Sequence, residues 1–274
     1  MSQKINFYKN ILKKSGFVIK KFPNDNFIKQ IEKTIKKIFY RNEDYYLKIS
    51  LNKFHNIALK CQTALNKLKI QENFNKYEKN FLENIFDQEK ILYSVDITLR
   101  VVRPQETQLN DKNNTKSEAL GWHRETFYGN HKHIKYAYNF WMPVFNYSKK
   151  ICLNYIPHSH LISDDLIIRK KIKVTDNKVE KFSDSHKLGF PYSPKKIISG
   201  VNLSKGKKIF LPRKYYLLFS QLLVHGNGKN FSKKIRFAVN FSMVPKNKLM
   251  RNKKINKKKF DFVDTSNNNL FVEF

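Results

Sequence analysis

The hydrophobic pattern of this chain changes at Ile91, and this change limits the folds that are open to it. From Ile91 onward, short runs rich in β-branched and aromatic residues are separated by turns and loops, a pattern typical of strands. No regular helical pattern separates these runs, so the sequence favours an antiparallel sandwich or closed barrel over βαβ units. The predicted strands are 91–103, 136–145, 151–156, 207–211, 215–224 and 235–244.

The first ninety residues show a helical period instead. A short strand at 16–23 precedes a helix that Asn24 or Asp25 can cap, and further helical stretches follow at 51–68 and 74–87. We expect residues 1–90 to form a strand and helices packed on a β core at 91–245. A polar segment at about 163–196 reads as an inserted loop, and 246–274 as a basic tail with an apolar docking end at 270–274.

The formal net charge of +32 attracts anions of many kinds, from nucleic acid and acidic membranes to phosphorylated substrates. Only eight of the 54 basic residues are arginine, and lysine, asparagine, isoleucine and phenylalanine, which AT-rich codons encode, are abundant together. Codon bias therefore explains the charge as well as a functional basic surface does. Nucleic-acid interfaces usually cluster arginine with aromatic residues, and no such cluster is present. The charge alone does not decide the function.

The composition, with 41% hydrophobic and 14% aromatic residues, is that of a globular protein. No apolar run approaches the roughly 20 residues of a membrane-spanning helix, and no signal-peptide pattern is seen. Two cysteines, Cys61 and Cys152, are too few for a disulfide framework and are not spaced as a zinc site. We expect a soluble protein of the reducing cytoplasm.

One short motif contains candidate metal ligands. In the string Gly121-Trp-His-Arg-Glu-Thr-Phe-Tyr-Gly129, His123 and Glu125 are two residues apart, so on a strand they would point to the same side. One imidazole and one carboxylate are two ligands of the two-histidine, one-carboxylate triad that binds Fe(II) and leaves open positions. His225 is the best candidate for the third ligand. Arg236 follows it at the start of a strand, where a buried guanidinium calls for an anion, such as a carboxylate.

These residues resemble the ligand pattern of Fe(II)/2-oxoglutarate dioxygenases, and most closely the phytanoyl-CoA dioxygenase-type group. The resemblance covers about residues 16–244 and includes Ile156-Pro-His-Ser-His160 and the end formed by His225, Asn230, Ser232 and Arg236. The string around His123 is similar to oxygenases of sporadic carbohydrate and aminoglycoside-type biosynthetic clusters. The sequence departs from the group's pattern at two positions: Glu125 replaces the commoner aspartate, and His158 replaces a glycine.

The resemblance implies a mainly β protein with flanking helices, built on a double-stranded β-helix (jelly-roll or cupin-like) core. It implies that His123, Glu125 and His225 bind iron, and that Arg236 pairs with the distal carboxylate of 2-oxoglutarate. The implied reaction is the hydroxylation, or a related C–H oxidation, of a small polar metabolite, with a carbohydrate-derived molecule as the leading candidate. Two alternatives stay open: a nucleic-acid-modifying oxygenase that flips out a base, and a non-catalytic barrel that acts as a binding module. The sequence does not define the oligomeric state.

Further polar and aromatic residues are candidates for the substrate pocket. The candidates are Trp122, Tyr128, Asn139 and Arg100. Asn139 and Gln221 lie on strands expected to line the barrel, whereas Trp122, Tyr128 and Trp141 can also be read as core aromatic residues. Arg100 and Arg103 differ by three positions and so face opposite sides of a strand, and at least one is expected at the surface. Among the other histidines, His131 and His133 are expected in a solvated loop, and His158 and His160 in a loop that they hold by hydrogen bonds. His55 and His186 have no evident partners.

Overall fold

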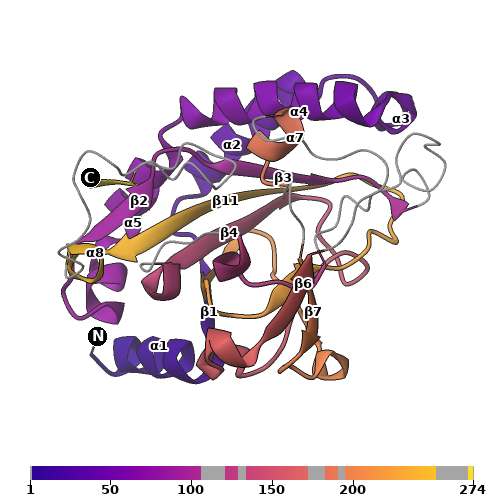
Figure 1. Cartoon of the computed structure of the whole chain (residues 1–274). Helices are drawn as coiled ribbons and strands as arrows, with labels where there is room; N and C mark the ends of the chain where they lie inside the picture. The colour runs from indigo at the N-terminus through magenta and orange to yellow at the C-terminus, as the bar shows by residue number, and fades with distance from the viewer. Residues whose placement is uncertain are drawn as a thin grey trace.

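A seven-stranded antiparallel sheet is the central element of the protein (Figure 1). The structure is a computed structural model that describes residues 2–105, 121–128, 134–171, 183–190, 195–250 and 271–273. The strands follow the order β1-β9-β4-β11-β2-β12, and β3 also pairs with β11. Their bounds are β1 Phe17–Lys21, β2 Ile91–Ser94, β3 Thr98–Val102, β4 Tyr138–Phe145, β9 Tyr215–Ser220, β11 Arg236–Pro245 and β12 Phe271–Glu273.

Two smaller antiparallel sheets complete the described β structure. One has the order β10-β5-β8, and the other is the pair β6-β7. The strands of the first are β5 Leu153–Tyr155, β8 Lys207–Ile209 and β10 His225–Asn227. Those of the second are β6 Ile168–Lys171 and β7 Lys195–Ser199.

The helices of the first ninety residues pack against the large sheet. They are α1 Ser2–Ser15, α2 Asp25–Ile38, α3 Glu43–Lys48, α4 Leu51–Asn66 and α5 Ile70–Ile85. The side chain of Asn24 caps α2 by accepting a hydrogen bond from the Phe27 amide at 3.0 Å. The apolar sides of α2, α4 and α5 share one buried cluster with β3, β4, β9 and β11. Figure 1 shows α2, α3 and α4 lying along the edge of the structure nearest β3 and β11.

Alternation along the strands separates apolar from polar side chains. On β11, Phe237, Val239 and Phe241 belong to the cluster shared with the helices, whereas Ala238 belongs to a second cluster with residues of the β10-β5-β8 sheet. Because side chains alternate between faces, Arg236 and Ser242 project to the same side as Ala238. The side of the large sheet that faces the small sheet therefore carries the polar groups of the site.

The predicted strand at 91–103 is wrong in one respect, because it is two strands. Both β2 and β3 pair with β11, but a bend separates them. At the bend, the Ser94 hydroxyl donates to the Asp96 carbonyl at 3.0 Å, and the Asn66 side chain of α4 accepts from the Ile97 amide at 2.9 Å. Side chains thus satisfy backbone groups that the ladder leaves unpaired, which a hydrophobic pattern does not reveal.

The predicted loop at 163–196 also contains regular structure. Besides β6 and β7 it includes the one-turn helix α7, Asp184–Lys187, which Ser183 caps and which packs on α4. Gln62 of α4 donates to the Lys187 carbonyl at 3.3 Å, and Asn56 to the Asp184 carboxylate at 3.2 Å. Since β6 and β7 are short, exposed and rich in lysine, their sequences lack the apolar alternation that predicts strands.

The C-terminal part that the structure describes returns to the large sheet. After β11 comes α8, Lys246–Met250, and β12 then pairs antiparallel with β2. His131, His133 and residues 251–270, about which the sequence made predictions, lie outside the described residues. No helix in the described ranges has the length and apolar character needed to cross a membrane.

Candidate metal centre

His123 and His225 come together through the backbone. They form an isolated antiparallel bridge, in which the His123 amide donates to the His225 carbonyl at 2.8 Å and the His225 amide to the His123 carbonyl at 2.9 Å. Paired residues of an antiparallel bridge project to the same side, so the two imidazole rings are neighbours, with centroids 4.4 Å apart. The fold thus unites two histidines that are a hundred positions apart in the sequence.

The prediction that His123 and Glu125 share a strand is wrong, although its geometric consequence holds. Only His123 is in a β-bridge, and Glu125 begins the 3₁₀ turn η1, Glu125–Phe127. Arg124 between them is extended, with φ −116° and ψ 154°, so His123 and Glu125 still point to one side. Arg124 points to the other side and is fully buried, where it donates to Asp164 at 2.7 Å and to the Ile162 carbonyl at 2.9 Å. The sequence did not predict this anchoring role of Arg124. The feature that could have indicated it is a charged residue placed between two ligands that point inward.

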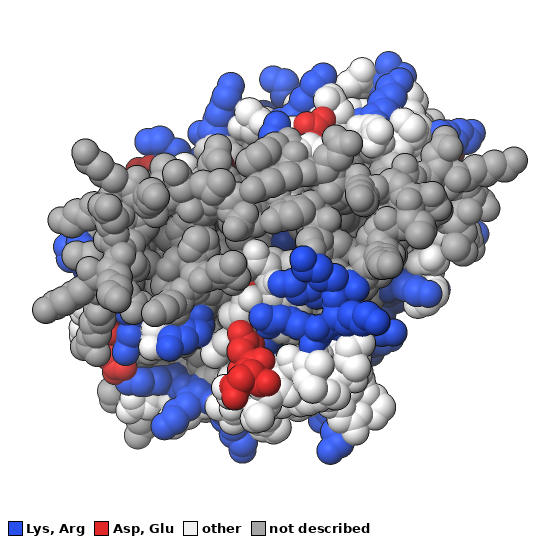
Figure 2. Space-filling view, viewed as in Figure 1, with Lys and Arg blue, Asp and Glu red and all other residues white. Residues whose placement is uncertain are grey.

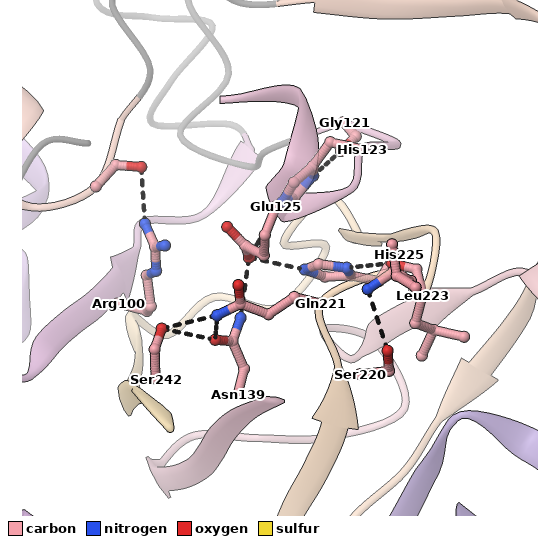
Figure 3. Close-up of polar contacts among 12 residues, drawn as sticks. Arg100, Gly121, His123, Glu125, Asn139, Ser220, Gln221, Leu223, His225 and Ser242 are labelled. Carbon is pink, nitrogen blue, oxygen red and sulfur yellow. Dashed lines mark hydrogen bonds and ion pairs between the residues drawn. The ribbon is translucent and has the colours of Figure 1, made fainter. Parts of the chain in front are cut away.

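The three side chains converge on one point (Figure 3). One ligand atom from each of His123, Glu125 and His225 lies within 4.8 Å of the others, in a group that can hold a metal ion. The Glu125 Oε1 atom is 3.5 Å from His225 Nε2 and 3.9 Å from His123 Nε2. Both histidines are buried, and Glu125 is partly buried.

Backbone carbonyls set the tautomer of both rings. His123 Nδ1 lies 2.7 Å from the Gly121 carbonyl, and His225 Nδ1 lies 2.9 Å from the Leu223 carbonyl. Because a carbonyl can only accept, each Nδ1 carries a proton, and each Nε2 is the ring atom left to face Glu125 and to bind a metal. Metal-binding histidines typically have such a partner. Two lone pairs and a carboxylate oxygen in one buried space are the donor set that a divalent cation satisfies.

The electrostatics of the centre keep the ligands in their binding forms. Burial, together with the charge of His225, lowers the pKa of His123 to about 4, so its ring is neutral near pH 7. Burial alone would raise the pKa of Glu125, but the neighbouring His225 and His123 side chains and the positive charge of Arg100 lower it to about 2. A neutral imidazole and an ionised carboxylate are the states that bind metal.

A buried amide network holds the carboxylate of Glu125 (Figure 3). The Asn139 side-chain nitrogen donates to Glu125 Oε1 at 3.0 Å. The amide oxygen of Asn139 accepts from Gln221 at 2.8 Å and from the Ser242 hydroxyl at 2.9 Å, which fixes the direction in which the amide points. Asn139 was predicted in the substrate pocket; the structure places it behind Glu125. Ser242 was not identified from the sequence. The feature that could have indicated its role is a single hydroxyl on the polar side of β11.

Replacing Asn139 by leucine is expected to weaken metal binding by about tenfold or more. The substitution keeps a similar volume but leaves the Glu125 carboxylate free to rotate, and loss of such an outer partner typically costs 10- to 100-fold, as an order of magnitude. Calorimetric titration with Co(II) would measure the affinity. Ser242→Ala serves as the control with a smaller effect, because Gln221 still orients Asn139. Unchanged Co(II) affinity in a folded Asn139→Leu protein would contradict this role.

Arg236 is a buried cation without a carboxylate partner among the described residues. It is fully buried, and its Nε and Nη2 atoms have no hydrogen-bond partner. Its Nη1 donates to the Asn227 side chain at 3.0 Å, and its guanidinium lies 5.6 Å from the centre of the Trp141 ring. Burial lowers the pKa of Arg236 to about 10, but it stays charged at neutral pH. Two orphaned donors of a forked guanidinium fit an anion that binds with both oxygens.

Arg100 and Arg103 lie on opposite sides of the sheet, as expected. The expectation that at least one lies at the surface is wrong, because α4 covers the side to which Arg103 points. Arg103 is fully buried, 5.0 Å from the centre of the Phe54 ring, and donates to the Ile49 carbonyl at 3.0 Å. Arg100 faces the metal centre, where its charge lowers the pKa of Glu125, and it donates to the Gly189 carbonyl at 2.9 Å.

The predicted aromatic pocket residues lie in different places. The Tyr128 ring is 5.7 Å from the His123 ring, so Tyr128 does border the centre. Burial and the charge of Glu125 raise the pKa of Tyr128 to about 12. Trp122 packs against a separate apolar cluster and lies so close to Gly206 that a Cβ there would come within 2.7 Å of its ring. Trp141 is a core residue beneath Arg236.

The loop around His158 and His160 is held by hydrogen bonds, as predicted. His158 Nδ1 and His160 Nε2 each lie 3.0 Å from a carbonyl at the end of α1, those of Lys14 and Lys13. The Ser159 hydroxyl accepts from the Val224 amide at 2.8 Å, which fixes the residue before His225. This loop therefore supports the metal centre from behind.

The prediction that His55 and His186 have no partners is wrong. His55 Nδ1 lies 2.7 Å from the Ser185 hydroxyl, and its ring stacks on Phe190, with centroids 4.9 Å apart. His186 is buried in α7 and also forms an interaction. Because α7 lies more than a hundred residues after α4 in the sequence, these contacts were not visible from spacing.

Acid is expected to destabilise the protein through His55. Burial, aided by the charge of Arg103, lowers its pKa from 6.5 to about 3. Between these two pH values, His55 is protonated in the unfolded chain but neutral in the folded chain. The free energy of unfolding therefore falls as the pH drops below 6.5, by about 1.4 kcal/mol per pH unit from this group. Urea unfolding of His55→Gln at pH 7 and pH 5 should show a smaller loss than the parent protein. His158→Gln, at an exposed histidine, is the control; equal acid losses in both variants would refute this assignment.

Comparisons with known proteins bear on the fold of the chain. No protein-family model and no curated protein matches the sequence. Among solved structures, the chain is similar to EvdO2 from Micromonospora carbonacea var. aurantiaca complexed with 2-oxoglutarate, at a TM-score of 0.57 and 10% identity, with 87% of this chain and 90% of that chain covered. It is also similar to the apo form of the non-heme monooxygenase ThoJ, at a TM-score of 0.52 and 11% identity, with 87% of this chain and 77% of that chain covered. A third similar structure is the epimerase SnoN in complex with Fe3+, alpha ketoglutarate and nogalamycin RO, at a TM-score of 0.50 and 11% identity, with 89% of this chain and 84% of that chain covered.

These likenesses, at 10–11% identity, establish the fold. The chain has a β-rich fold of antiparallel sheets and helices that is similar to these solved structures, which confirms the predicted fold class at this level.

Proposed function

We propose that the protein is an Fe(II)- and 2-oxoglutarate-dependent oxygenase that oxidises a C–H bond of a small molecule. The observation that carries the proposal is the convergence of His123, Glu125 and His225 with both Nε2 lone pairs directed inward. The donor set and its carbonyl partners fit a divalent iron, which takes two imidazoles and one carboxylate and keeps open positions. When bound, Fe(II) with 2-oxoglutarate and dioxygen supplies the oxidising chemistry, with succinate and carbon dioxide as coproducts.

The residues of the chain divide the remaining work. His123 and His225 present neutral nitrogen donors, and Glu125 supplies the negative charge that Asn139 keeps in place. The Arg236 guanidinium, through its two free donors, binds the distal carboxylate of 2-oxoglutarate. Burial of both histidines and of Arg236 limits the access of water to the space between the sheets.

The finer assignment is part of the same proposal. The resemblance around the triad supports a phytanoyl-CoA dioxygenase-type enzyme with a double-stranded β-helix core at 91–245, a helical annex before it and a tail after it. The solved relatives support a small-molecule substrate, since SnoN forms a complex with nogalamycin RO and EvdO2 forms one with 2-oxoglutarate. We propose a polar, carbohydrate-derived substrate and a place in the cytoplasm.

Succinate release tests the proposed reaction. The purified chain with Fe(II) and 2-oxoglutarate is expected to form succinate, and faster with a sugar or nucleotide-sugar pool that contains the substrate. A His123→Ala, His225→Ala double variant is the control for metal-independent background. If no pool raises succinate above that control, the carbohydrate assignment fails; if 2-oxoglutarate is never consumed at all, the reaction class fails as well.

A further inference from the structure

The two-stranded β6-β7 sheet carries five basic side chains on two short strands. They are Arg169, Lys170, Lys171, Lys195 and Lys196. Figure 2 shows blue side chains gathered where Figure 1 places β6 and β7, beside a small acidic patch. The overall excess of lysine accounts for their number, so only their arrangement carries information.

The pairing register divides these side chains between two faces. Arg169 lies opposite Ile197, Lys170 opposite Lys196, and Lys171 opposite Lys195. Ile197 is buried in a cluster with Phe127, so Arg169, although exposed, lies on the face of the pair that meets this cluster, which we call the inner face. Because side chains alternate, Lys171 and Lys195 share this inner face, whereas Lys170 and Lys196 form the outer face.

The inner face borders the metal centre. The Arg169 guanidinium lies 4.7 Å from the centre of the Phe127 ring, and the Lys195 ammonium donates to the Phe127 carbonyl. Phe127 belongs to η1, the turn that begins with Glu125. The backbone of Lys195 also hydrogen-bonds to the Tyr128 hydroxyl, and Tyr128 lies against His123. Arg169 and Lys195 therefore contact the turn that Glu125 begins, and Lys171 lies opposite Lys195 on the same face.

The inner cations repel one another, and none of them pairs with an acidic side chain among the residues that the structure describes. Like charges directly opposite on paired strands destabilise the pair, and Lys195 is half-buried, where solvent screens the repulsion less. Burial and the charges of Arg169 and Lys171 lower the pKa of Lys195. In the described ranges, no carboxylate forms an ion pair with any of the three, and the nearby Asp164 pairs with Arg124 instead. An anion that binds between these cations would reduce the repulsion among them.

We propose that Arg169, Lys171 and Lys195 bind a phosphate or diphosphate group of the substrate and so present its carbon skeleton to the metal centre. This inference rests on the proposed function for the identity of the centre. A forked guanidinium and two ammonium groups on one short face match the several oxygens of a phosphate group. The cluster is compact rather than a stripe, and only one of its members is arginine, which favours a phosphorylated small molecule over a nucleic acid.

Two double variants of equal charge test the proposal. Arg169→Gln with Lys171→Gln removes two cations from the inner face, and Lys170→Gln with Lys196→Gln removes two from the outer face. Pyrophosphate is titrated calorimetrically into each full-length protein at low and at physiological ionic strength. The inner variant should bind at least about tenfold more weakly than the parent, since each charge-assisted hydrogen bond contributes about that factor. The outer variant should stay within about twofold, because Lys170 and Lys196 project to the opposite face and would not contact the bound anion.

The outcomes separate the anion site from the oxygenase assignment. His225→Ala should lose metal binding and retain pyrophosphate binding. A parent protein that binds pyrophosphate but no divalent metal would count against the proposed function alone. No pyrophosphate binding, or equal losses in the two double variants, would overturn the anion site and leave the metal centre standing. Malonate binding as tight as pyrophosphate would overturn the choice of phosphate. If a single-stranded oligonucleotide binds tightly and its affinity falls equally in both variants, the β6-β7 sheet is part of a nucleic-acid surface, which also overturns the proposal.

Discussion

Replacing His225 by alanine is expected to lower the affinity for Fe(II) by more than about a hundredfold and to abolish succinate formation. The side chain supplies one of only three donor atoms, which lie within 4.8 Å of one another, and even partners outside the ligand set typically contribute 10- to 100-fold, as an order of magnitude. Anaerobic Co(II) titration followed by visible absorption measures the effect without relying on activity. The fold should persist, because the backbone bridge between His225 and His123 does not involve the lost imidazole.

His158→Ala is the matched control for this change. His158 is also a histidine with a backbone carbonyl partner, but it lies at the surface, away from Glu125. Its loss should leave the Co(II) affinity within about twofold of the parent, since it donates nothing to the centre. Retention of normal Co(II) binding in a folded His225→Ala protein would show that the ligand assignment is wrong.

Replacing Arg236 by leucine is expected to weaken 2-oxoglutarate binding by about a hundredfold while making the ligand-free protein no less stable. The loss of affinity follows from the removal of one partner of a buried charge pair, which costs about 2–5 kcal/mol. Stability is maintained because the change also removes a buried cation with two unpaired donors, which is costly to the folded state. Calorimetry on the Co(II)-loaded protein measures the first effect, and urea unfolding measures the second.

Arg124→Leu should behave in the opposite way. Arg124 is equally buried, but it pairs with Asp164 at 2.7 Å and donates to the Ile162 carbonyl at 2.9 Å. Because its loss leaves these groups without their partner, the substitution should destabilise the protein by about 3 kcal/mol. Arg236→Lys keeps the charge without the fork and should restore part of the 2-oxoglutarate affinity. A large loss of stability in Arg236→Leu with unchanged 2-oxoglutarate binding would make Arg236 a structural residue.

The sequence predicted those features that depend on local pattern. The alternation in 235–244 predicted β11, and the three-to-four period after Asn24 predicted α2, because both patterns reflect which side of an element is buried. The spacing of His123 and Glu125 predicted that they project together, and this holds because Arg124 is extended. The turn at Glu125 was missed, since a 3₁₀ turn of three residues leaves no period to detect.

What the sequence did not predict depends on contacts between distant segments. The bridge between His123 and His225, the contact between His55 and Ser185, and the network of Asn139, Gln221 and Ser242 each join residues from separate elements. Hydrogen bonds of this kind are fixed by the tertiary fold and not by neighbours in the chain. The basic β6-β7 sheet is a further example, because its pairing register decides which basic side chains share a face.

An anaerobic titration of the 2-oxoglutarate-loaded protein with Fe(II) tests the central claim most directly. If His123, Glu125 and His225 hold the iron and Arg236 holds the cosubstrate, a weak visible charge-transfer band should grow to saturation at one Fe(II) per chain. The band should be absent from His225→Ala and should need far more 2-oxoglutarate in Arg236→Leu. Absence of the band in the parent protein, or an undiminished band in His225→Ala, would contradict the proposed centre.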